Sequence, residues 1–290
     1  MGYKKWEKIF IALGILSVFL AMTFLFSITL KLFIDGMHRI FDIKFYTSYP
    51  SRFPEEAGIL SSWVGTLYVI IGAVFWSIFF GVPTGIYLEE FGVKGKLAKI
   101  IEANITNLSA VPSIVYGLLA LGIFVYRFNF GESILTAGLT LGLLMLPVIV
   151  VATRESLRRI PRAIREGSYA LGCTHYELVF HHLLPYSIGG ILTGVIIATA
   201  RAIGETAPLL TIGALTFIAF LPPPPWEDFI GMLKSPFTVL PIQMFNWVSR
   251  PQEAFHKNAA AAGFILLVLS LLLNSISYYV RYKVRRKYHW

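Results

Sequence analysis

The chain has 290 residues, of which 56% are hydrophobic and 14% are charged, and its mean hydropathy is +0.68. A soluble domain carries about 25% charged residues, so this composition excludes a soluble globular protein and predicts an integral membrane protein. A net charge of +9 suggests nucleic acid in a soluble protein, but here the basic residues cluster beside apolar runs, as the positive-inside bias predicts. Cys173 is alone, which excludes an internal disulfide and a cysteine-based zinc cluster.

Several apolar runs exceed the roughly 20 residues that a helix needs to cross the hydrocarbon core, so the fold class is all-α and polytopic. Six transmembrane helices are expected, at about residues 9–30, 63–88, 105–126, 133–152, 186–204 and 259–280. The first run is too long for a signal-peptide core and is interpreted as a retained span. Lys and Arg concentrate in the segments placed inside, so both termini are expected in the cytoplasm.

Three regions follow from this topology. Residues 1–62 form an N-terminal span and an outer loop, in which Pro50 and Pro54 forbid a continuous helix. Residues 63–280 form the core, with a long inner loop at 153–185, and residues 281–290 form a basic cytoplasmic tail.

Prolines predict interruptions within the spans. Pro83 predicts a kink in the second span, and small residues around Pro112 predict close packing or a kink in the third. Pro208 and Gly213 interrupt the fifth span before the apolar run resumes to Leu221, so this segment is either one crossing or a crossing plus a re-entrant piece. Residues 222–226, PPPPW, then predict a stiff polyproline exit.

The inner loop has the pattern of two short helices. A helix over 162–171 is expected to end at Gly172 in a left-handed cap. Thr174 and Glu177 have the spacing of a capping box that begins a second helix, which Pro185 is expected to close. An interfacial helix on the lipid headgroups and a partner-binding element both fit this pattern.

Three histidines of this loop, His175, His181 and His182, raise the question of a metal site. Adjacent positions on a helix point to different faces, and no acidic residue completes a ligand set, so an interface role is favoured and no metal is expected.

The fifth span contains an arginine and a glutamate. Arg201 and Glu205 are four residues apart and share one helix face. An ionisable residue at this depth costs at least about 2.5–3.5 kcal/mol, so it should face protein or water. Two readings remain: a salt bridge that braces two helices, or a substrate pathway in which the planar Arg201 fork binds an oxyanion, Glu205 orients it and Thr206 adds a hydroxyl donor.

The inner loop resembles the EAA loop of ABC-importer permeases. The matching residues are Glu166-Gly167-Ser168, Gly172 after three residues, His182 after nine more, and Leu184-Pro185; Gly-Ser replaces Ala-Ala and His182 replaces an apolar residue. The resemblance implies the MetI-like fold of a type I ABC importer permease. It further implies a coupling helix at Glu166–Pro185 that docks in a groove of a cytoplasmic ATPase.

Other segments resemble one family of these permeases. ARAIGETAPLL, SRFPEEAGI, NLSAVPSIVYGLL and LRRIPRAIREGSYALG are similar to PstA, the permease family of the phosphate-specific ABC importer. The resemblance implies an inner-membrane subunit for phosphate import, working with a homologous PstC-like permease, two copies of a PstB-like ATPase and an extracytoplasmic PstS-like phosphate-binding protein.

The sequence argues against an enzyme. No Walker A motif, G-x-x-x-x-G-K-[ST], occurs, so ATP hydrolysis is expected in a partner chain, and no catalytic residue or cofactor is expected. All histidines and aspartates fall outside the expected spans, which disfavours an intramembrane hydrolase. A permease for another oxyanion, such as sulfate or molybdate, remains an alternative, as does an ion-coupled secondary carrier that uses Glu205 as a proton site.

Overall fold

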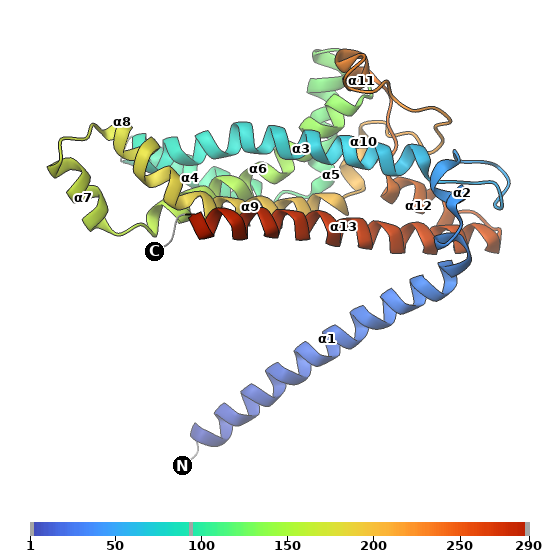
Figure 1. The fold of residues 1–290 in the computed structure, drawn as a ribbon, viewed down its shortest axis with the longest axis horizontal. Coiled ribbons are helices and arrows are strands. Elements are labelled where there is room, and N and C mark those ends of the chain that lie inside the picture. The colour runs from blue at the N-terminus through green and yellow to red at the C-terminus, as the bar shows by residue number, and fades with distance from the viewer. Residues whose placement is uncertain (1–2, 93–94, 288–290) are drawn as a thin grey trace.

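The computed structural model describes residues 3–92 and 95–287, and every helix or strand element in this part of the chain is helical. The predicted all-α class is therefore confirmed. Figure 1 shows an elongated bundle of long helices that lie alongside one another, with one helix leaving it at an angle. The long helices are α1 (Tyr3–Ile40), α3 (Leu60–Ile86), α6 (Ile134–Arg158), α9 (Leu184–Ile203) and α13 (Glu253–Lys287).

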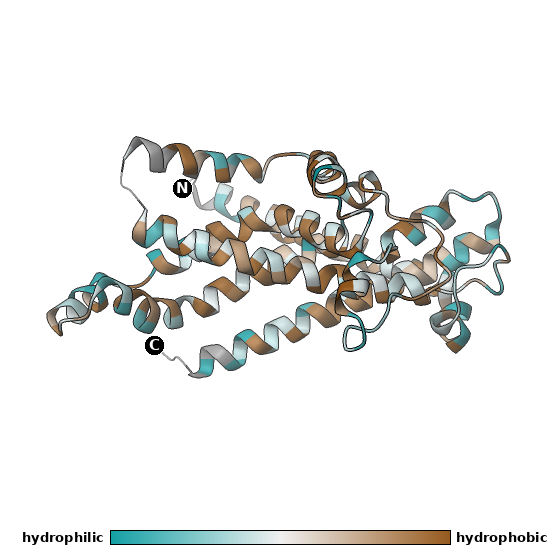
Figure 2. Cartoon of the chain, turned by 90° about the horizontal axis from the view of Figure 1, so that it is seen from above, coloured by the Kyte–Doolittle hydropathy of each residue, from teal (hydrophilic) through white to brown (hydrophobic). Residues whose placement is uncertain are grey.

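Short helices and turns connect these long ones. On the side of the bundle that holds the C-terminus lie the π-helical turns η1 (Tyr87–Phe91) and η3 (Leu178–Leu183), with α4 (Lys96–Leu108), α7 (Arg162–Ala170) and α8 (His175–Glu177). Toward the opposite end lie α2 (Ile43–Thr47), α11 (Phe229–Lys234) and α12 (Leu240–Val248). Figure 2 shows hydrophilic residues gathered at both ends of the bundle and hydrophobic residues between them, which is the distribution that a membrane-spanning bundle requires.

Five helices of the described chain are long and apolar enough to cross a membrane, one fewer than the six predicted. The missing span is the third. Its helix is broken at 109–112, and only the shorter apolar helix Ser113–Arg127 follows, made of α5 (Ser113–Ala120) and the π-helical turn η2 (Leu121–Arg127). Pro112 is the N-cap of α5 with an extended ψ of 135°, so the predicted kink is a complete interruption.

Several span boundaries also differ from the prediction. The first helix continues to Ile40 and the fourth to Arg158, so residues 31–40 and 153–158 are helical and not loop. The fifth ends at Ile203. After it only the short helix α10 (Ala207–Thr211) forms, and Gly213 has a φ of +89°. The apolar run to Leu221 is therefore not a continuation of the span.

Close backbone contact joins α3 to α6. A Cβ added at Gly81 would lie 2.9 Å from Ile149 Cγ2, and one at Gly85 would lie 2.7 Å from Thr153 Cβ. Small residues permit this approach, and in a membrane such packing takes the place of a hydrophobic driving force between helices. We therefore regard α3 and α6 as one rigid pair.

A half-buried arginine fixes the C-terminal end of α1. Arg39 donates to Asp42 Oδ2 at 2.8 Å, to Asn258 Oδ1 at 3.0 Å and to the backbone oxygens of Pro54 and Ala57. These contacts join α1, the loop before α3, and α13. We call this group of five residues the outer knot.

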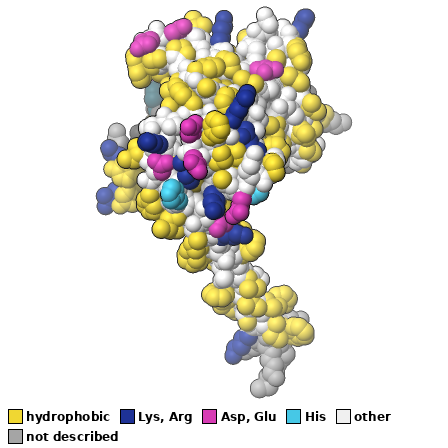
Figure 3. Space-filling view, turned by 90° about the vertical axis from the view of Figure 1, so that its right-hand side faces the viewer, with side chains coloured by type: hydrophobic (Ala, Val, Ile, Leu, Met, Phe, Trp, Pro, Cys, Tyr) yellow, Lys and Arg dark blue, Asp and Glu magenta, His cyan; other side chains and the backbone are white. Residues whose placement is uncertain are grey.

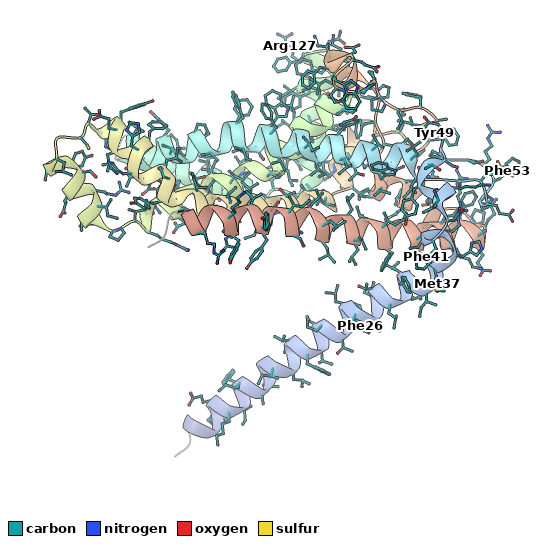
Figure 4. All side chains as sticks on the ribbon, in the orientation of Figure 1. Phe26, Met37, Phe41, Tyr49, Phe53 and Arg127 are labelled. Atoms are coloured by element: carbon teal, nitrogen blue, oxygen red, sulfur yellow. The ribbon has the colours of Figure 1, made fainter. Side chains whose placement is uncertain are left out.

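Inward of the outer knot, α1 leaves the bundle. The side chains from Trp6 to Phe26 are exposed throughout. Phe26 lies on the diverging part of α1, whereas Tyr49 and Phe53 lie over the end of the bundle (Figure 4). Viewed from that end, acidic and basic side chains are interspersed over the bundle, and the projecting helix is largely hydrophobic (Figure 3).

Candidate functional site

Arg201 lies in the last turn of α9, and its side chain is 48% exposed. Its Nε lies 3.5 Å from Glu205 Oε1, so the predicted contact forms, but at the outer limit of a hydrogen bond. The helix ends at Ile203, so Glu205 stands just beyond it. Among the residues that the structure describes, the terminal guanidinium nitrogens of Arg201 have no hydrogen-bond partner.

The level of Arg201 in the bundle follows from its neighbours in the chain. Ala202 and Ile203 line a small cavity together with Val69 and Ile70 of α3 and Leu141 of α6. These α3 and α6 residues belong to the main apolar core, away from the helix ends. Arg201 therefore lies at the depth of the apolar core.

Thr206 lies outside any helix, immediately before α10. Its Oγ1 is 3.5 Å from the backbone oxygen of Gly204, which is too long for a strong hydrogen bond. The three residues predicted for the pathway thus cluster where α9 ends. Nearby, Gly117 lets α5 approach α10 closely: an added Cβ would lie 2.7 Å from Pro208 Cα and would clash with Thr211 Oγ1.

The loop between α6 and α9 begins as predicted. Gly172 has a φ of +85°, in the left-handed region, and follows α7 and its C-cap. Thr174 Oγ1 accepts from the Glu177 backbone N–H at 3.3 Å, and Glu177 Oε2 accepts from the Thr174 backbone N–H at 2.8 Å. The predicted capping box is confirmed.

The prediction that Pro185 closes the second helix is wrong. Helix α8, η3 and α9 form one continuous helical stretch, His175–Ile203, and Pro185 lies in the first turn of α9. Proline is tolerated in a first turn because the N–H that it lacks has no essential partner there. The π-helical turn η3, immediately before α9, lets the helix continue through Pro185.

The loop residues of the EAA pattern differ in exposure. Glu166 and Gly167 are exposed, whereas Ser168 is buried and donates to the backbone oxygen of Ile164 at 2.8 Å. Leu184 and Pro185 are half-buried. Beside them the loop exposes apolar side chains that the sequence analysis did not single out: Tyr169, Leu171, Tyr176 and Phe180. Leu171, at 88% exposure, is an unusual position for leucine and suits a protein contact.

An ionic cluster that the sequence analysis missed lies beside this loop, in η1 at the C-terminal end of α3. Glu89 accepts from Arg158 Nε at 2.8 Å and from Arg154 Nε at 3.3 Å. Glu90 accepts two hydrogen bonds from Arg165, at 2.6 and 2.8 Å. The sequence shows these arginines only as inner positive charge. Two consecutive glutamates at the end of an apolar helix were the available signal.

The Glu90 carboxylate controls the ionisation of its partner. Its hydrogen bond to Arg165 raises the pKa of the guanidinium, and this outweighs the opposing effect of burial. Arg165, which is a cation at every relevant pH, is held by Glu90 in a two-bond, fork-shaped contact.

An all-helical bundle with spans long enough to cross a membrane, a charged group at core depth and an ordered loop between α6 and α9 is compatible with a membrane transport subunit. Residues 81–286 match the family model described as "Binding-protein-dependent transport system inner membrane component". The chain belongs to this family. It is therefore a multi-pass inner-membrane permease of a binding-protein-dependent ABC transporter.

The chain is also similar to proteins named for phosphate transport. The phosphate transport system permease protein PstA of Yersinia pestis is 32% identical, covering 84% of this chain and 77% of that protein. PstA of Haemophilus influenzae is 27% identical, covering 93% and 92%. PstA 1 of Mycobacterium tuberculosis is 29% identical, covering 81% and 74%.

Among solved structures, a similar chain is found in an inward-facing form of the MetNI methionine ABC transporter. The TM-score is 0.57 at 18% sequence identity, covering 78% of this chain and 94% of that chain. This likeness supports the predicted MetI-like fold. Family membership also decides between the two transporter classes left open by the sequence, against the ion-coupled carrier. It implies a binding protein and an ATPase as partners and places ATP hydrolysis outside this chain.

Proposed function

We propose that this chain forms half of the translocation pathway of an ATP-driven phosphate importer, with Arg201 as its anion-binding group. The observation that carries the proposal is a 48%-exposed arginine at the depth of the apolar core. A permanently charged side chain at this depth is too costly to face lipid, so it must face water or another protein. A water-filled path for an anion provides that environment.

The geometry of Arg201 and Glu205 suits binding of an oxyanion followed by its release. Glu205 meets only Nε of Arg201, at 3.5 Å, so two terminal nitrogens remain for an incoming oxyanion. A guanidinium fork matches two oxygens of a tetrahedral anion. The nearby carboxylate opposes a second negative charge and keeps binding weak, and Thr206 adds one hydroxyl donor.

Phosphate is proposed as the substrate because of the names of the relatives. Their names specify phosphate, and their similarity extends over more than four-fifths of this chain. Another oxyanion, such as sulfate or molybdate, would meet the same arginine fork, so the substrate must be tested directly.

The proposed partners are those that the resemblance to phosphate permeases implies. The loop Glu166–Pro185, with its exposed Leu171, docks on a PstB-like ATPase dimer, and residues Glu166, Gly167, Ser168, Gly172, Leu184 and Pro185 shape that contact. A PstC-like permease covers the open side of Arg201, and a PstS-like protein delivers phosphate at the outer end. In this topology both termini are cytoplasmic; residues 288–290 of the basic tail lie outside the described residues.

The test begins with tagged chain extracted in mild detergent and identification of the subunits that co-purify. The complex is then placed in liposomes with its binding protein, and uptake of radiolabelled phosphate is measured with and without ATP. We expect ATP-dependent phosphate uptake that unlabelled phosphate suppresses and sulfate or molybdate does not. Suppression by another oxyanion at lower concentration than phosphate would reassign the substrate. Isolation of the chain without an ATPase would overturn the proposal.

A further inference from the structure

The loop between α6 and α9 is hydrogen-bonded to Glu90 of η1, the π-helical turn that continues α3. The Glu90 side chain is 3% exposed, and both carboxylate oxygens accept from Arg165 of α7, at 2.6 and 2.8 Å. The same arginine donates to the backbone oxygen of Leu157, at the end of α6, at 3.1 Å. The first half of the loop is therefore fastened to the ends of both α3 and α6.

The second half of the loop reaches the same residue. His175, the first residue of α8, contacts the Glu90 backbone oxygen through Nε2 at 3.0 Å. Its Nδ1 lies 2.7 Å from the Tyr169 hydroxyl, and its ring meets the Phe91 ring edge-on, with centroids 4.9 Å apart. Both halves of the loop converge on Glu90.

An apolar cluster also packs the loop against the ends of α3 and α6. The residues buried together in this cluster are Ile86, which ends α3, Leu157 of α6, and Leu178, Val179 and Leu183 of η3. Val82 of α3 packs against both this cluster and the main core of the bundle. The loop is thus a packed extension of the inner ends of α3 and α6.

Helix α3 connects this attachment to the depth of Arg201. At Gly81 and Gly85, the backbone of its C-terminal half lies directly against α6 side chains. Farther along, Val69 and Ile70 line the cavity that also borders Ala202 and Ile203, next to Arg201. A second connection exists, because η3 continues directly into α9.

We propose that Glu90 is the positioning residue through which movement of the cytoplasmic loop enters α3, so that the loop, α3 and α6 move as one body. The inference rests on the proposed docking of the loop on an ATPase. It goes further in choosing α3 over α9 as the main route: the helical connection to α9 alone does not couple the loop to the pathway.

The test separates attachment from docking. Glu90→Gln, Arg165→Gln, the single reversals E90R and R165E, and the reciprocal E90R with R165E are compared in the complete complex in liposomes. ATP hydrolysis and phosphate uptake are measured on the same preparation, together with the amount of ATPase retained. The His175 contact uses the backbone of residue 90, so every variant leaves it available.

We expect each single reversal to retain the ATPase but to lower phosphate taken up per ATP hydrolysed by about tenfold or more, the equivalent of 1.4 kcal/mol of lost coupling. The reciprocal pair, which restores opposite charges, should recover uptake per ATP to within roughly threefold of the original. A merely structural role would lower protein amount or ATPase retention and leave this ratio unchanged.

A matched control is available at the other end of the molecule. Glu253 and Lys257 form an exposed pair at 4.0 Å in the first turns of α13. Single reversals there, and E253K with K257E, should leave uptake per ATP unchanged, because an exposed pair contributes little.

Two outcomes overturn the proposal. Unchanged uptake per ATP in E90R and R165E would mean that α9 suffices as the route. Low uptake in the reciprocal pair, with normal accumulation and ATPase retention, would mean that the Glu90–Arg165 contact itself is not the link. Where a single reversal fails to accumulate, phosphate uptake per ATP hydrolysed is compared instead between the original complex, the reciprocal pair and Glu90→Gln. Failure of the proposed function is distinguishable, since it appears in the unaltered complex as absence of ATPase or of ATP-dependent uptake.

Discussion

The inner ionic cluster and the Arg201–Glu205 pair use the same two residue types in opposite ways. At the inner cluster, Glu90 is almost fully buried and binds Arg165 through two short hydrogen bonds. At core depth, Arg201 is half-exposed and meets Glu205 at 3.5 Å through one atom. A short, two-bond contact holds two elements in fixed relation, whereas a long, single contact leaves the arginine available to a third group. Ion pairs in this molecule are therefore distinguished by geometry and burial and not by their composition.

The largest expected effect comes from breaking the buried contact. Glu90→Ala leaves Arg165 partly buried without its carboxylate partner, which costs about 3 kcal/mol or more. We expect a lower unfolding temperature for the purified chain in detergent, measured by intrinsic fluorescence. Glu89→Ala is the companion variant, and it should also destabilise, because it removes the carboxylate that meets both Arg154, which is 10% exposed, and Arg158, which is 42% exposed. Equal unfolding temperatures for Glu90→Ala and the original chain would contradict the buried-contact interpretation.

The next effect concerns Arg201. Arg201→Gln removes the charge and the fork, and losing a charged hydrogen bond of about 2–3 kcal/mol should lower uptake roughly 30–150-fold. Arg201→Lys keeps the charge without the fork, so an intermediate loss of about tenfold is expected. Uptake is measured in membranes with equal amounts of the chain. If Arg201→Gln instead fails to accumulate while Arg201→Lys transports normally, the arginine is a structural brace.

A smaller effect is expected at Gly172. Its φ of +85° is unfavourable for any side chain, while an added Cβ would meet no atom within 4 Å. Gly172→Ala therefore tests backbone strain alone and should cost about 1–2 kcal/mol, loosening the loop and weakening retention of the ATPase. Gly167→Ala is the matched control, because Gly167 is helical with equally open space, and alanine there should stabilise by up to about 1 kcal/mol. Limited proteolysis of the loop reports both; similar rates in the two variants would contradict the strain argument.

The smallest effect on stability is expected at Glu205. A 3.5 Å contact to a half-exposed arginine contributes under about 1 kcal/mol, so Glu205→Gln should unfold at nearly the original temperature. Its effect should appear in transport: removing the opposing charge should tighten phosphate binding and slow release, which lowers the maximal rate and the half-saturating concentration together. A large fall in unfolding temperature would erase the contrast between the two ionic sites.

Local features of the sequence predicted the structure well. The capping box of Thr174 and Glu177, the left-handed Gly172 and the Arg201–Glu205 contact all depend on residues within four positions of one another. Propensity and helix geometry determine such features without reference to the rest of the fold. The apolar spans followed equally from hydropathy, because the membrane dictates their length.

Features that depend on distant residues were missed or misjudged. Glu90 and Arg165 are 75 positions apart, so no local pattern pairs them. The break at 109–112 was expected only as a kink, because hydropathy measures apolar length and not continuity of the backbone. Pro185 was expected to end a helix, but its effect depends on whether a new helical turn begins there, which the preceding π-helical turn decides.

The outer knot has a consequence for biogenesis. Arg39 and Asn258, which it joins, are 219 positions apart, and Asn258 belongs to the last helix of the described chain. During synthesis from the N-terminus, α1 enters the bilayer before α13 is synthesised, so α1 is at first surrounded by lipid without its packing partner. Lipid tails are as apolar as its side chains, so waiting carries little penalty. The Arg39–Asn258 hydrogen bond then forms only when α13 is inserted, and a chain that loses α13 would leave Arg39 with Asp42 and the backbone oxygens of Pro54 and Ala57 as its partners.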